Sequence, residues 1–141
     1  MSEKILIIDH EPDILKALET ILKKEGYQVR SASGSEDAIS VLKSEPFDLV
    51  IMDIRMPGMD GLEFMRQVKK LGDDMEVIVL TGSASIENAV KALRYDGAFD
   101  FLTKPLENMD QLINSVEKVL QKHRLQKKKR FSGRENRSMR N

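Results

Sequence analysis

The strongest constraint on the fold is a regular alternation of short apolar runs with segments of helical periodicity. The apolar runs lie in order along the chain, at residues 5–8, 27–32, 49–52, 77–80 and 99–102. The first, third and fourth runs are uninterrupted and rich in Ile and Val, which is typical of strands buried on both faces. The sequence therefore predicts five strands of a parallel sheet.

Apolar residues spaced three and four apart follow each run. In residues 14–22 they form one face of a helix, and similar segments occupy residues 38–42, 60–68, 86–93 and 108–120. Strands that alternate with helices indicate an α/β fold with right-handed crossovers and helices on both faces of the sheet. Five strands are too few for an eight-stranded barrel, so we predict an open, doubly wound sheet.

The zero net charge conceals a division of the chain. Residues 1–121 hold 14 Lys and Arg against 22 Asp and Glu, 14 − 22 = −8, whereas residues 122–141 hold 9 against 1, 9 − 1 = +8. We expect one acidic domain over residues 1–121, followed by a basic linker or tail over 122–141 that begins as a helical extension and then becomes disordered. The tail has no helix-turn-helix pattern, so nucleic acid is not an expected partner of this segment.

Composition and length exclude several classes of protein. The chain has no cysteine, which excludes disulfides, thiolate metal sites and a cysteine nucleophile. The apolar runs are too short for a membrane span, and the N-terminus lacks the pattern of a signal peptide, so we expect a cytoplasmic protein without membrane contact. No Gly-rich loop with Gly-Lys-Ser/Thr occurs, which argues against nucleotide hydrolysis.

Polar residues stand where four of the predicted strands end. They are Asp9, His10 and Glu11 after the first strand, Asp53 after the third, Thr81 after the fourth and Lys104 after the fifth. Ligands of open α/β sheets bind beyond these ends. Clustered carboxylates attract a divalent cation such as Mg²⁺, a carboxylate can attack phosphorus, and a Lys and a Thr can bind phosphoryl oxygens. The pattern predicts phosphoryl chemistry at this edge.

Four segments, in this order, resemble the response-regulator receiver domain of two-component signalling. They are residues 5–13 (ILIIDHEPD), 53–61 (DIRMPGMDG), 81–82 (TG) and 104–105 (KP), and the resemblance extends over residues 3–121. It implies a flavodoxin-like sheet with strand order 2-1-3-4-5. It also implies a phosphoacceptor rather than an enzyme, with self-catalysed phosphorylation and dephosphorylation.

The resemblance also implies the chemistry of Asp53. This residue would take a phosphoryl group from a sensor histidine kinase or a phosphotransfer protein, in a reaction that needs Mg²⁺ or Mn²⁺. Asp9, Asp53 and the main-chain carbonyl of Arg55 would hold the metal, with His10 or Glu11 as a further ligand.

Other residues would respond to the phosphoryl group. Lys104 would pair with it, Thr81 would hydrogen-bond it, and Phe101 would act with Thr81 as a switch. The fourth helix, fifth strand and fifth helix would control an output module, a partner or a homodimer. A cis bond before Pro105 and a tuning role for Ser83 are implied as well.

His10 departs from the family, which has an acidic metal ligand at this position. Imidazole binds metals, but Mg²⁺ prefers oxygen, and Glu11 would point to the opposite face if the strand continued. Two alternatives therefore stay open. The chain is a degenerate receiver that binds proteins without phosphorylation, or it is an aspartyl-phosphate phosphatase whose nucleophile is Asp9.

Overall fold

The five expected strands form one parallel sheet in the order β2-β1-β3-β4-β5. In the computed structural model they are β1 (Lys4–Ile8), β2 (Gln28–Ala32), β3 (Leu49–Met52), β4 (Glu76–Thr81) and β5 (Asp100–Thr103). The structure describes residues 3–55, 60–72, 74–82, 89–95, 97–104 and 109–139, without the side chains of 62, 95 and 127–139. The order confirms the predicted open, doubly wound fold.

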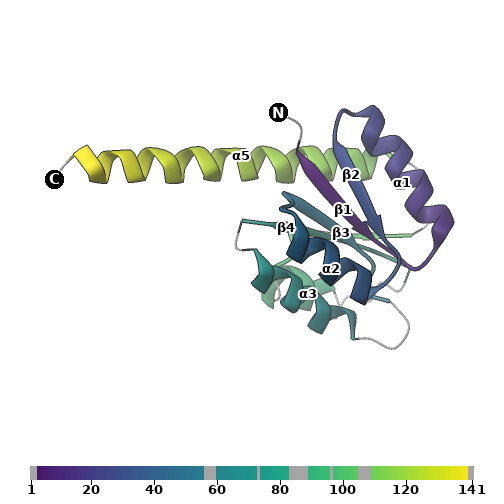
Figure 1. Cartoon of the computed structure of the whole chain (residues 1–141). Helices are drawn as coiled ribbons and strands as arrows, with labels where there is room; N and C mark the ends of the chain where they lie inside the picture. Colours follow the sequence, from purple (N-terminus) through teal and green to yellow (C-terminus); the bar gives the residue numbers. More distant parts are fainter. Residues whose placement is uncertain are drawn as a thin grey trace.

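Helices cover both faces of this sheet (Figure 1). They are α1 (Pro12–Lys24), α2 (Ser35–Ser44), α3 (Gly61–Leu71) and α5 (Asp110–Met139), with a π-helical segment η1 (Lys91–Tyr95) before β5. Pro12 opens α1, where its missing N–H is tolerated, and Lys23 and Lys24 lie near the negative end of the helix dipole. Of the helix expected at 86–93, residues 86–88 lie outside the described part of the chain.

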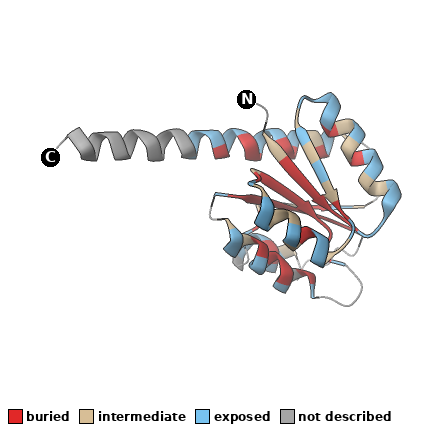
Figure 2. Ribbon diagram, in the orientation of Figure 1, coloured by how far each residue is buried: buried red, intermediate tan, exposed pale blue. Residues whose placement is uncertain are grey.

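Alternate residues of the central strands enter different cores. Leu6 and Ile8 of β1 pack into the core under α2 and α3, while Ile5 and Ile7 pack into the core with α1 and α5. Figure 2 shows the resulting buried strands between helices that are exposed on their outer sides. Burial on both faces explains why β1, β3 and β4 are continuous apolar runs, whereas the edge strand β2 keeps exposed positions.

The register aligns the carboxyl ends of the strands. Ile8, the last residue of β1, lies opposite both Ala32 at the end of β2 and Met52 at the end of β3. Thr81 likewise lies opposite Thr103 at the ends of β4 and β5. Residues that follow these strands therefore meet along one edge of the sheet.

α5 is anchored at the opposite edge of the sheet. His123 is 3% exposed, and its Nε2 lies 2.9 Å from Oδ1 of Asp48, the residue before β3. The other carboxylate oxygen of Asp48 accepts a hydrogen bond of 2.9 Å from the backbone N–H of Lys4. His123 therefore fastens the helix to the first residues of two central strands.

Beyond this anchor α5 continues past the edge of the sheet (Figure 1). Its backbone is helical to Met139. The division at residue 121 into a domain and a linker stays a prediction. Among the described residues, no helix combines the length and the apolar character needed to cross a membrane.

Replacing His123 tests the anchor. We expect His123→Ala to lower the free energy of unfolding by about 1–3 kcal/mol, because Asp48 keeps its desolvation while it loses a partner. Urea denaturation followed by circular dichroism measures this change. Gln121→Ala, an exposed position of the same helix, is the matched control and should change stability by less than about 0.5 kcal/mol. Equal effects of the two substitutions would contradict the anchoring role.

Candidate functional site

The polar residues predicted at the strand ends do meet at one edge of the sheet. The backbone N–H of Asp9 donates to the carbonyl of Ala32 at 3.2 Å, and that of Asp53 donates to the carbonyl of Ile8 at 3.1 Å. The two aspartates thus continue the hydrogen-bond ladders of β1 and β3. Both residues are buried, with 2% and 3% of their surface exposed.

Lys104 joins the two buried carboxylates. Its Nζ lies 2.6 Å from Oδ2 of Asp9 and 3.0 Å from Oδ2 of Asp53, and a longer contact of 3.2 Å reaches the half-exposed carboxylate of Glu11. Two carboxylates in one buried site repel each other, so a shared cation lowers the cost of keeping both ionised. The backbone N–H of Lys104 also donates to the carbonyl of Thr81 at 2.8 Å, which fixes the chain as it leaves β5.

The two contacts with aspartate determine the titration of Lys104. Burial lowers the pKa of its ammonium group, but the hydrogen bonds and negative charges of Asp9 and Asp53 outweigh burial and raise this pKa above its usual value of 10.5. The ammonium group is therefore charged throughout the physiological range.

Backbone N–H groups hold the remaining carboxylate oxygens. Glu11 donates its backbone N–H to Oδ1 of Asp9 at 2.9 Å, and Arg55 donates its own to Oδ1 of Asp53 at 2.8 Å. Each bond spans two residues and folds the chain back over the aspartate that precedes it. Both aspartates are thereby fixed in orientation, as a site that must hold a ligand in one geometry requires.

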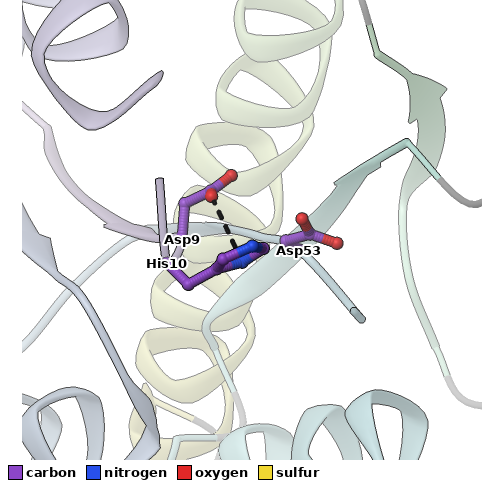
Figure 3. Close-up of side chains that lie close together, drawn as sticks. All are labelled: Asp9, His10 and Asp53. Atoms are coloured by element: carbon purple, nitrogen blue, oxygen red, sulfur yellow. Dashed lines mark ion pairs between the residues drawn. The ribbon is translucent and has the colours of Figure 1, made fainter. Parts of the chain in front are cut away.

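His10, one of the two further metal ligands that the resemblance offered, lies close to both aspartates. One ligand atom each from Asp9, His10 and Asp53 lie within 4.8 Å of one another, a group that does not include Glu11. Figure 3 shows the imidazole ring of His10 directed towards Asp53, with the carboxylate of Asp9 beside it. The donors of this group suit a divalent cation, since carboxylate oxygen and imidazole nitrogen are both metal ligands.

Thr81 and Phe101 lie on the two strands next to this group. Thr81 is fully buried at the end of β4. Phe101 lies opposite Val79 in the register and packs, partly buried, against the core under α2 and α3. Ser83, residues 56–59 and the bond before Pro105, to which the resemblance gave roles, lie outside the described residues.

The resemblance noted in the sequence is confirmed by comparison with known proteins. The sequence signature of the family described as "Response regulator receiver domain" matches residues 5–117. The transcriptional regulatory protein DctD of Rhizobium meliloti, which by its name regulates C4-dicarboxylate transport, is 38% identical over 121 residues, 86% of this chain and 26% of its own. The chain thus spans about a quarter of the length of this curated relative.

Solved structures agree in fold and in family. A receiver domain of Methanospirillum hungatei superposes with a TM-score of 0.83 at 32% identity, covering 89% of this chain and 99% of its own. The response regulator TrrA of Thermotoga maritima, in complex with Mg²⁺-BeF, gives 0.71 at 33% over 83% of this chain and 98% of its own. The beryllofluoride-activated NtrC4 receiver domain dimer gives 0.79 at 32% over 85% and 98%.

The sheet order and the acidic group beyond its strands are those of a flavodoxin-like α/β domain with a ligand site at its carboxyl edge. The chain belongs to the response-regulator receiver family.

Gly61 has a role that the sequence did not reveal. At this position an added Cβ would lie 1.9 Å from the carbonyl oxygen of Ile54. The first residue of α3 therefore packs directly on the backbone that follows Asp53. Only a tertiary approach of this kind explains the glycine, and no local pattern indicates it.

The glycine is tested by adding one methyl group. We expect Gly61→Ala to cost about 1–3 kcal/mol of stability, because backbone rather than a flexible side chain must move. Thermal unfolding measures the change. Gly72→Ala is the control, because its added Cβ would meet Met75 at an ordinary 3.6 Å. A Gly61→Ala variant as stable as the wild type would contradict the close packing of Gly61 on the backbone of Ile54.

The ammonium group of Lys104, which Asp9 and Asp53 share, is tested by removing it. We expect Lys104→Met to lower stability by about 2 kcal/mol at neutral pH, less than the roughly 3–5 kcal/mol of a fully buried pair because solvent reaches the site. The folded-state pKa of Lys104 is raised, so its contribution is complete below the usual pKa and is lost as the pH rises through the folded value.

The pH dependence of stability measures this contribution of Lys104. The stability difference between the wild type and Lys104→Met, taken from urea titrations, should be constant up to about pH 10 and narrow above it. Lys16→Met, which removes an exposed lysine of α1, should show no such difference. A difference that persists in strong alkali would mean that packing, and not charge, accounts for the effect.

Proposed function

We propose that this receiver domain accepts a phosphoryl group on Asp53 in a metal-dependent reaction. The observation that carries the proposal is the buried Asp53 carboxylate, which receives one hydrogen bond from Lys104 and another from the Arg55 backbone. The donor would be a phosphohistidine of a sensor histidine kinase or of a phosphotransfer protein. The proposal includes the cytoplasmic location expected from the sequence.

The reaction is a displacement at phosphorus. A carboxylate oxygen of Asp53 attacks, a new O–P bond forms, and the P–N bond to the donor imidazole breaks with its electron pair going to nitrogen. A divalent cation held by the Asp9 and Asp53 carboxylates, and by the carbonyl of Arg55, would neutralise the phosphoryl oxygens. The TrrA structure, which contains Mg²⁺-BeF, supports this part of the proposal.

Lys104 and Thr81 would then hold the product. The ammonium already lies 3.0 Å from Asp53, and it can keep this contact while it turns towards the added charge. Thr81, whose carbonyl accepts the backbone N–H of Lys104, would donate its hydroxyl to a phosphoryl oxygen. Phe101 would repack in response, because its partly buried ring borders the core of the neighbouring helices.

The output would leave through β5, α5 and the segment from residue 89 to 95. Asp100 at the start of β5 accepts a hydrogen bond of 2.7 Å from Ser115 of α5, which couples the strand to the helix. The NtrC4 neighbour is a dimer, and DctD is a transcriptional regulator of which this chain matches only a part. We therefore propose that α5 leads towards an output module or a second copy of the chain.

Phosphorylation by a small phosphodonor tests the function. Incubated with phosphoramidate and a divalent cation, the wild type should shift completely on a phosphate-affinity gel, and Asp53→Asn should not shift, because it lacks the attacking carboxylate. Asp13→Asn, an exposed aspartate of α1, is the control and should behave as the wild type. Asp9→Asn should be slowed at least tenfold through weaker metal binding.

Each alternative has its own outcome. A gel shift that is retained in Asp53→Asn and lost in Asp9→Asn would favour the phosphatase with Asp9 as its nucleophile. A wild type that stays unshifted with every cation would favour the degenerate receiver, in which the site serves protein binding alone.

A further inference from the structure

We propose that His10 is a direct metal ligand and that the site consequently binds first-row transition-metal dications in preference to Mg²⁺. The inference deepens the proposed function by naming the class of its metal. It concerns the one residue of the site that departs from the family.

The position of His10 allows direct coordination. A ring nitrogen of His10 and one oxygen each of Asp9 and Asp53 lie within 4.8 Å of one another. Two ligands of one metal can be no farther apart than twice the bond length, which is about 4.2 Å for bonds of about 2.1 Å. Closing the largest separation needs a movement of about half an ångström, which a side chain that is 40% exposed can make by rotation.

No strong contact with Asp9 opposes this movement. Nδ1 of His10 lies 3.8 Å from Oδ1 of Asp9, beyond hydrogen-bonding distance, and that oxygen already accepts the backbone N–H of Glu11 at 2.9 Å. The carboxylate is therefore held in place while the imidazole beside it can move towards a metal.

The charge of the site weakens binding of Mg²⁺ in particular. With imidazole in place of a third carboxylate, the two aspartates supply the negative charge of this three-residue group, and the ammonium of Lys104 neutralises part of it from 2.6 and 3.0 Å. Mg²⁺ binds proteins through charge and oxygen ligands and gains little from imidazole nitrogen.

Transition metals recover that loss through the nitrogen. Their affinity for nitrogen ligands rises from Mn²⁺ to Ni²⁺, and imidazole is a common ligand of these ions. We therefore expect the order Mg²⁺ < Mn²⁺ < Ni²⁺ for this site, with the differences set by His10.

Metal binding without a phosphodonor tests the order. Isothermal titration of the tag-free chain should give at least tenfold tighter binding of Mn²⁺ than of Mg²⁺, and tighter binding still of Ni²⁺. In His10→Asp the affinity for Mg²⁺ should rise and that for Ni²⁺ should fall, so that the Ni²⁺ to Mg²⁺ ratio drops at least a hundredfold. Equal ratios in the two proteins would overturn the proposal.

A spectroscopic measurement identifies the ligand. Pulsed electron paramagnetic resonance of the Mn²⁺ complex should show ¹⁴N modulation from imidazole, and His10→Asp should lack it. The chain has two histidines, and the other, His123, is buried against Asp48 at the far edge of the sheet. His123→Gln should therefore keep the modulation. Its absence from the wild type, or its loss with His123, would contradict coordination by His10.

The metal-binding experiments and the phosphorylation experiment can fail independently. A chain that shows the modulation but accepts no phosphoryl group on Asp53 would overturn the proposed function alone. A chain that is phosphorylated with Mg²⁺ and shows no preference for Mn²⁺ or Ni²⁺ would overturn the metal inference alone.

Discussion

The ammonium group of Lys104 pairs with both of the carboxylates that the fold places in one buried site. The parallel order of β1, β3, β4 and β5 carries two carboxylates into a buried edge, where they repel each other. Lys104 reaches both from the end of β5, at 2.6 and 3.0 Å. The edge strand β5 is therefore bound electrostatically to β1 and β3, the two central strands that lead to Asp9 and Asp53. The resting arrangement and its response to a ligand depend on the same cation.

Much of this could be predicted from the sequence, because it rests on local pattern. The apolar runs predicted all five strands, and β1, β3 and β4 have the continuous apolar signature of burial on both faces. The strand ends then indicated Asp9, Asp53, Thr81 and Lys104, because parallel strands bring their carboxyl ends to one edge. The order 2-1-3-4-5 came from the resemblance to receivers, since periodicity alone does not say which strands are neighbours.

What could not be predicted depends on how the chain bends and packs after its strands and helices form. The direction of His10 follows from the bend after β1, where the alternation of a strand no longer applies. The close packing of Gly61 on Ile54 requires the entry angle of α3. The burial of His123 had a weak signal, because it continues the spacing of Val116 and Leu120 on α5, but its partner Asp48 could be found only once α5 was placed on the sheet.

The anchoring of β5 limits where the strand can move. Asp100 accepts the backbone N–H of Phe101 at 2.8 Å with one oxygen and the hydroxyl of Ser115 at 2.7 Å with the other, so the start of the strand is bound to α5 by hydrogen bonds. Its far end is held by the backbone hydrogen bond from Lys104 to Thr81 and by the ion pairs of Lys104. Hydrogen bonds of this kind do not depend on the charge of the site, whereas the ion pairs do. A change of charge at Asp53 would therefore act on the end that leads to Lys104, whereas the hydrogen bond between Asp100 and Ser115 does not depend on it.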